Sequence, residues 1–349
     1  MNVGIQPGSG LYLHVKWFAA DHEWTPQAMS KVLTPTFLFW FSFTIVVLLL
    51  VSRYNAALEC IPIVVKVHSF LNKLKRFHLL IMRVGVGIAL LMQISTGSYL
   101  APTLRIETWW VYALLIISLL GLLHRKTLFI SGIALGVLYV KALANYGMFH
   151  MLDYMFYLGI IYYLLVANTR WSRSGIPVLY VWTGLSLAWL AMEKLTLAKL
   201  ACSLMHEYGI PSLGFTVEDF VLISAFIELG LAWAFIVGIM NRFTALLLTG
   251  LFLVTTTVFG FTEIIGHMIM HTILLIFLIV GRDGYTTFLL SRRAPKLRSF
   301  FVVLHFTIMI FSMMTVYIWM GQPSSGFTVP DPATQAAQAS KIPAFCPIK

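Results

Sequence analysis

The chain has 349 residues and a formal net charge of +11, with 59% hydrophobic and only 11% charged residues. Soluble globular proteins carry roughly a quarter charged residues, so this composition excludes that class and indicates a protein of the lipid bilayer. The positive residues lie in loops between apolar runs, which is the pattern of the positive-inside rule. The basic balance therefore indicates membrane topology and no nucleic-acid partner. The sequence contains three cysteines, too few for a disulfide scaffold.

The apolar runs predict an all-α, polytopic membrane bundle with ten spans. An N-terminal segment, 1–34, precedes them and a tail, 321–349, follows them. We divide the rest into 35–78, with the first span and a basic loop, two four-span units at 79–170 and 176–283, and 284–320, with a loop and the last span. The expected spans are 35–52, 79–97, 109–123, 127–145, 153–167, 176–198, 217–239, 243–261, 263–281 and 300–320.

Every second loop between these spans is basic, and the others hold few lysines or arginines. The five basic loops agree in phase and so belong on one side, which the positive-inside rule assigns to the cytoplasm. The pattern predicts a bacterial inner-membrane protein with both termini extracytoplasmic. Cys202 and Cys346 then lie outside, where disulfides persist, and form a candidate pair. The basic loops contain residues 53–76, 125–126, 170–173, 242 and 282–298.

An internal repeat is indicated by two short segments. The sequence GLLHRKT at 121–127 resembles GIMNRFT at 238–244, and the same register places His150 on His267 without a gap. Two four-span units that run in the same direction would form a parallel repeat about an axis along the membrane normal. The first and tenth spans are then additions to this pair.

A polar stripe interrupts the ninth apolar run. Glu263, His267 and His271 recur at every fourth residue, so they lie on one face of a helix. Ionisable groups are costly in lipid and by default mark a functional site. Imidazole and carboxylate ligands suit copper or iron, and a histidine also suits haem or a quinone. The structural alternative is a hydrogen-bonded network that fixes helix packing.

Further polar residues fall in the outer half of the other spans. Three of them are Glu193, Lys194 and Glu228. Their functional interpretation is an ion pair or a proton path toward a quinone, and the structural alternative is a buried ion pair that holds neighbouring helices together. His150 is either an interfacial loop histidine or, through the repeat, a second haem ligand. With the stripe, these residues predict an outward-facing cavity. Its candidate catalytic residues are His267, Glu228 and Glu193, its candidate cofactor-binding residues are His271, His150 and Lys194, and its candidate metal ligands are Glu263, His267 and His271.

The second four-span unit resembles the DoxX/DoxD family of four-span membrane proteins. The resemblance is carried by Gly184, Glu193-Lys194, Tyr208-Gly-Ile-Pro211, Glu228-Leu-Gly230, Gly238 with Asn241-Arg242, and Gly266-His267. The first unit looks like a diverged copy without the Glu-Lys pair. DoxD-type members are subunits of a thiosulfate:quinone oxidoreductase, and other members are tied to thiol and oxidative-stress systems. The resemblance therefore implies redox work beside the quinone pool.

Together these features predict an integral membrane, redox-associated protein, in the form of a quinone-linked oxidoreductase subunit. The candidate cofactors are quinone, haem, copper or iron. The expected partners are the bilayer, the quinone pool or a small-molecule substrate, and other membrane or extracytoplasmic redox subunits. Two alternatives are a transporter for a metal ion or small solute, and a non-catalytic membrane anchor for a redox partner.

Overall fold

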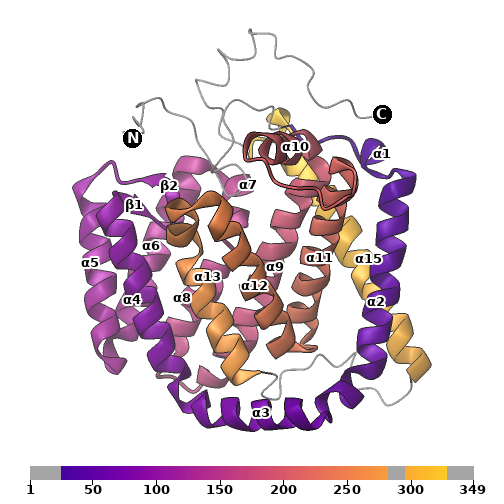
Figure 1. Cartoon of the computed structure of the whole chain (residues 1–349). Helices are drawn as coiled ribbons and strands as arrows, with labels where there is room; N and C mark the ends of the chain where they lie inside the picture. The colour runs from indigo at the N-terminus through magenta and orange to yellow at the C-terminus, as the bar shows by residue number, and fades with distance from the viewer. Residues whose placement is uncertain (1–24, 282–294, 328–349) are drawn as a thin grey trace.

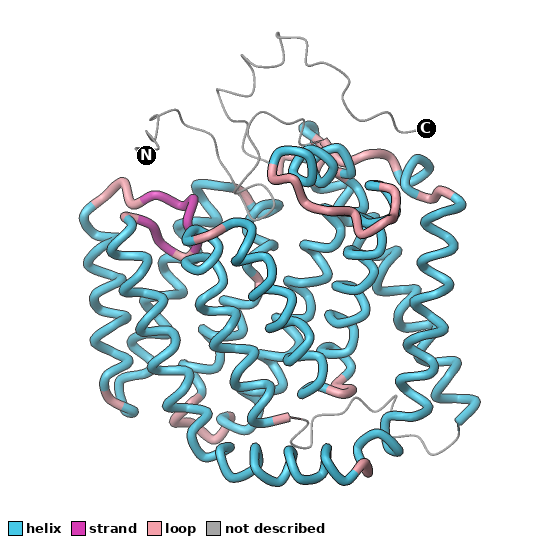
Figure 2. The backbone as a smooth tube through the Cα atoms, viewed as in Figure 1, coloured by secondary structure: helices cyan, strands magenta, loops and turns pink. Residues whose placement is uncertain are grey.

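The computed structural model describes residues 25–281 and 295–327, and it is a bundle of helices (Figures 1 and 2). A single two-stranded antiparallel hairpin, β1 with β2, follows α4 in the described part of the chain. The elements are α1 Met29–Val32, α2 Pro35–Glu59, α3 Pro62–Leu74, η2 Lys75–Phe77, α4 His78–Thr96, β1 Ser98–Tyr99, β2 Ala101–Arg105, α5 Trp109–Leu123, η3 Arg125–Thr127, α6 Leu128–Tyr146, α7 Met148–Met151, η4 Leu152–Tyr154, α8 Phe156–Val166, η5 Ser172–Ser174, α9 Gly175–Thr196, α10 Ala198–Glu207, α11 Val217–Val237, α12 Asn241–Phe259, α13 Phe261–Val280, α15 Pro295–Met320 and η6 Pro323–Ser325.

The lengths and composition of the helices indicate an integral membrane protein. Within the described residues, eight helical runs are long and apolar enough to cross a bilayer, and a bent pair would make a ninth. The bent pair joins Met148–Tyr154 to Phe156–Val166 at 63°, so the span expected at 153–167 corresponds to the second arm of this pair and begins at the bend. Asp153 lies in the 3₁₀ turn at this bend. The apolar helix α5 has 15 residues, fewer than the roughly 20 that a full crossing prefers.

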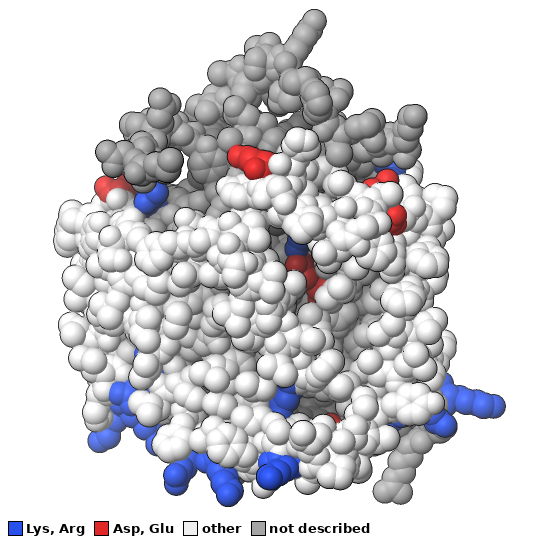
Figure 3. Space-filling view, viewed as in Figure 1, with Lys and Arg blue, Asp and Glu red and all other residues white. Residues whose placement is uncertain are grey.

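The connections of the bundle alternate between its two ends (Figure 1). The hairpin, α7 and α10 lie at one end, whereas α3 runs across the other. Lysine and arginine side chains gather at the α3 end of the face shown in Figure 3, below a broad uncharged band. The predicted common side of the basic loops at 53–76, 125–126, 170–173 and 242 agrees with this arrangement, and most of the loop at 282–298 lies outside the described residues. We call the α3 end the basic end.

The basic loop expected at 53–76 is mostly helical. α2 continues to Glu59, and α3 begins at Pro62 after a break at Cys60 and Ile61. The apolar residues Ile63, Val67 and Phe70 share one face at helical spacing and are exposed. An amphipathic helix of this kind lies in the membrane interface, where apolar and basic faces are both satisfied. The lysines within this segment led to its prediction as a loop.

The upright helices pack in a closed series that brings distant segments together. α4, α5, α6 and α8 follow one another, α8 packs against α9, and α9, α11, α12 and α13 continue until α13 packs against α4. α2 and α15 pack against each other and against the helices of the second unit. Gly85 allows the approach of α4 to α13, because a Cβ there would lie 2.1 Å from Thr272 Oγ1. Gly184 does the same for α9 and α11.

Candidate functional site

The stripe on α13 is anchored by groups on α12. Glu263 and His267 are both buried, and Glu263 Oε1 lies 3.0 Å from His267 Nδ1. Thr255 on α12 donates a hydrogen bond of 2.6 Å to the same carboxylate oxygen. The His267 ring stacks on Phe252 with centroids 4.3 Å apart, and His271 meets the edge of Phe252 at 6.0 Å. The predicted shared face of the three residues is thus present and is held by an aromatic ring and a hydroxyl.

An ion pair on α9 and α11 extends this group. Lys194 donates a hydrogen bond to Glu228, and their side chains are 15% and 13% exposed. Lys194 also interacts electrostatically with Glu263. Four helices therefore contribute to one polar group: Lys194 from α9, Glu228 from α11, Thr255 from α12 and the stripe from α13. We call these residues the α9–α13 group.

The lateral face of the bundle is hollowed. Figure 3 shows acidic and basic atoms inside a hollow at mid-height of this otherwise uncharged face. This face is the one that upright apolar helices present to lipid (Figure 1). Charged groups inside such a hollow are accessible to a lipid-soluble ligand. Within the α9–α13 group, the side chains of Lys194 and Glu228 are more exposed than those of Glu263 and His267, which are each 5% exposed.

Glu193 belongs to a different group from its neighbour Lys194. Successive residues of a helix point about 100° apart, so the two side chains leave α9 on different sides. Glu193 is 1% exposed and interacts electrostatically with Tyr317 on α15, as does the buried Asp153. Ser186 on α9 donates a hydrogen bond of 2.5 Å to the Asp153 carbonyl. The predicted joint role of Glu193 and Glu228 therefore gains no support from this geometry.

His150 lies with aromatic residues that surround this second group. Its ring centroid is 5.4 Å from that of Phe149, and Phe149 contacts both Trp189 and Tyr317 at 5.9 and 4.8 Å. His267 instead stacks on Phe252. The two histidines that the repeat aligns thus have different neighbours, and the haem prediction gains no support from their surroundings.

The residues of the stripe do not converge as metal ligands. Among the described residues, no three His, Cys, Asp or Glu side chains form a group that could hold a metal ion. Glu263 already accepts a hydrogen bond from Thr255, and the His267 ring lies flat against Phe252. The arrangement suits hydrogen bonding and proton exchange better than metal ligation. Cys346 lies outside the described residues, so its pairing with Cys202 stays a prediction.

Sequence reasoning missed the residues that complete both groups. Phe252 and Thr255 lie in an apolar run, where an aromatic residue and a threonine attract no notice. The Thr255 hydroxyl, which donates to Glu263, also lies 3.0 Å from the carbonyl oxygen of Phe252 on its own helix. Tyr317, which is fully buried in α15, offered one usable signal in the sequence. It is a tyrosine within an apolar span, and a phenol hydroxyl among packed helices needs a polar neighbour.

Comparisons of the chain with models of protein families, with curated proteins and with solved structures find no match. The DoxX-like resemblance therefore stays a prediction. The interpretation of the α9–α13 group rests on its own residues, their contacts and their burial.

Proposed function

We propose that this integral membrane protein is a quinone-binding subunit of a redox system and that the α9–α13 group is its quinone site. The observation that carries the proposal is a buried histidine, stacked on an aromatic ring, whose carboxylate partner Glu263 interacts electrostatically with Lys194 of the partly exposed ion pair. The lateral face of the bundle also has a hollow with charged atoms inside it (Figure 3). A quinone is lipid-soluble, its two carbonyl oxygens accept hydrogen bonds, and its ring stacks on aromatic side chains. These properties match the group and its position.

The chemistry assigns a role to each side chain. Conversion of a quinone to a quinol takes up two electrons and two protons. His267 donates a hydrogen bond to one carbonyl oxygen, and Glu263, held by Thr255, orients the imidazole and replaces its proton. Lys194 and Glu228 supply the second proton through their own pair. A partner redox subunit supplies the two electrons in this proposal.

The proposed architecture has ten spans, in two DoxX-like four-helix units with one additional helix at each end. One pair of helix contacts supports the repeat. The last helix of the first unit, α8, packs against the first helix of the second unit, α9, and the last helix of the second unit, α13, packs against the first helix of the first unit, α4. This reciprocal packing is expected of two equivalent units.

The proposed orientation places the basic end in the cytoplasm of a bacterial cell and both termini outside. The positive charge of that end supports this orientation (Figure 3). The α9–α13 group then lies in the outer half of the membrane. The partner redox subunit is correspondingly placed on the extracytoplasmic side.

The test is quinone retention by the whole chain purified in mild detergent. We expect a stoichiometric quinone that exchanges with added quinone and is lost in His267→Ala, while the exposed His206→Ala variant on α10 retains it. An optical spectrum and metal analysis of the same sample address haem, copper and iron. Solute uptake by proteoliposomes without quinone binding would favour the transporter. Absence of both, with a partner subunit retained and active in His267→Ala, would favour the anchor.

A further inference from the structure

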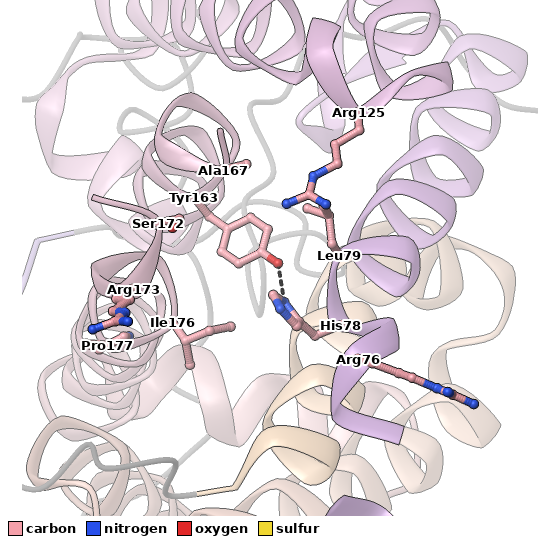
Figure 4. A pocket seen from close by; sticks show the side chains of 10 residues that line it. All are labelled: Arg76, His78, Leu79, Arg125, Tyr163, Ala167, Ser172, Arg173, Ile176 and Pro177. Carbon is pink, nitrogen blue, oxygen red and sulfur yellow. Dashed lines mark hydrogen bonds between the residues drawn. The ribbon is translucent and has the colours of Figure 1, made fainter. Parts of the chain in front are cut away.

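A cavity of about 520 Å³ opens at the basic end of the bundle, away from the α9–α13 group. It lies where α4 and α9 begin, beside the last turn of α8 and the turn between α5 and α6 (Figure 4). Its volume falls within the range of roughly 300–1,000 Å³ that is typical of small-molecule sites. Its lining consists of Arg76, His78, Leu79, Arg125, Tyr163, Ala167, Ser172, Arg173, Ile176 and Pro177.

All the formally charged side chains that line the cavity are positive. Arg76, Arg125 and Arg173 supply three guanidinium groups, and none of the described residues that line the cavity is a carboxylate. Arg125 interacts electrostatically with the hydroxyl of Tyr163 and faces it across the cavity, whereas Arg76 and Arg173 stand toward the edge (Figure 4). Three like charges around one cavity repel each other, so an anion between them relieves an unfavourable arrangement.

The floor of the cavity is built from polar groups that are held in place. Tyr163 is 3% exposed, and its hydroxyl lies 2.5 Å from His78 Nδ1. The helical run of η5 and α9 begins at Ser172, beside the cavity. The partial positive charge of this helix N-terminus therefore adds to that of the arginines.

We propose that this cavity binds a phosphate-bearing anion through Arg125 and Arg173, with the Tyr163–His78 pair as its floor. Guanidinium groups match phosphate oxygens in bidentate geometry, and the apolar side chains of Leu79 and Ile176 cover the remainder of the ligand. Basic pockets between membrane helices commonly hold anionic lipid headgroups, and a soluble phosphate offers the same chemistry. The site is independent of the quinone proposal.

Isothermal titration calorimetry of the whole chain in zwitterionic detergent tests this site. The probes are dihexanoyl phosphatidylglycerol, dihexanoyl phosphatidylcholine, glycerol 3-phosphate and inorganic phosphate, with sodium chloride at matched ionic strength. Saturable binding of phosphatidylglycerol alone identifies a lipid headgroup site, and saturable binding of glycerol 3-phosphate or phosphate identifies a soluble ligand. Absence of saturable binding by all anionic probes overturns the proposal.

Variants locate any binding that is found. Arg173→Gln and Arg125→Gln replace exposed side chains, so both are expected to fold, and each should weaken the affinity at least about ten-fold because a charged hydrogen bond is lost. Arg53→Gln on α2 removes an exposed arginine that does not line the cavity and should bind as the unmodified protein does. Equal loss in all three variants, or no loss in the two cavity variants, would overturn the proposed location.

Discussion

Breaking the Lys194–Glu228 pair is expected to destabilise the protein strongly when one partner is removed, and weakly when both are. Lys194→Met leaves the Glu228 carboxylate, 13% exposed, without its cation, and it also removes a favourable electrostatic interaction with Glu263. Loss of one partner from a buried pair costs about 3–5 kcal/mol. Because both side chains are partly exposed, we expect the lower end, about 3 kcal/mol.

The assay is a double-mutant cycle on unfolding free energies, measured by reversible SDS-induced unfolding in mixed micelles. Lys194→Met and Glu228→Gln are measured singly and together. The double variant should lie within about 1 kcal/mol of the unmodified protein, because it leaves no uncompensated charge. Lys31→Met removes an exposed lysine and serves as the control, with an expected change below about 0.5 kcal/mol.

Two results would refute this reasoning. Additive effects of the single variants would mean that Lys194 and Glu228 do not depend on each other. A stable double variant that still binds quinone as the unmodified protein does would separate the pair from the proposed site. The expected outcome is a folded double variant with lost or greatly weakened quinone binding.

Two further perturbations concern packing and the support of the stripe. Gly184→Ala should destabilise the protein by about 1–3 kcal/mol in the same unfolding assay, because its Cβ would lie 2.7 Å from the Ala232 carbonyl oxygen of α11. The control Gly250→Ala has nothing within 4 Å of its added Cβ and should be neutral or slightly stabilising. Thr255→Val should cost about 1.5–3 kcal/mol, because the Glu263 carboxylate loses a hydrogen bond of 2.6 Å. Equal unfolding free energies for both glycine variants, or an unchanged value for Thr255→Val, would contradict these contacts.

Much of the helical architecture could be predicted because apolar length and loop charge act locally. The spacing of Glu263, His267 and His271 likewise places them on one face through the geometry of a single helix. α3 was missed because an interfacial helix mixes apolar and basic residues, as a loop also does. The bend at Asp153 lies at η4. The sequence has no Gly or Pro in this turn that would have indicated a break in the helix.

The partners of the site residues were harder to predict because they come from other helices. Adjacent charges at Glu193 and Lys194 suggest one site, yet α9 directs them into two groups. One group contains Glu228 of α11, and the other contains Tyr317 of α15. Which neighbour each side chain meets depends on how the helices assemble, and close approaches such as that at Gly184 determine that assembly. No single stretch of sequence contains this information.

Photolabelling with a quinone analogue tests the central claim most directly. The whole chain in lipid nanodiscs is irradiated with a photoreactive quinone, and labelled peptides are mapped with and without excess natural quinone. The proposed function predicts competable labelling within 217–281, which contains α11, α12 and α13, and its loss in His267→Ala. Labelling confined to other helices, or labelling that excess quinone does not reduce, would contradict a quinone site at the α9–α13 group.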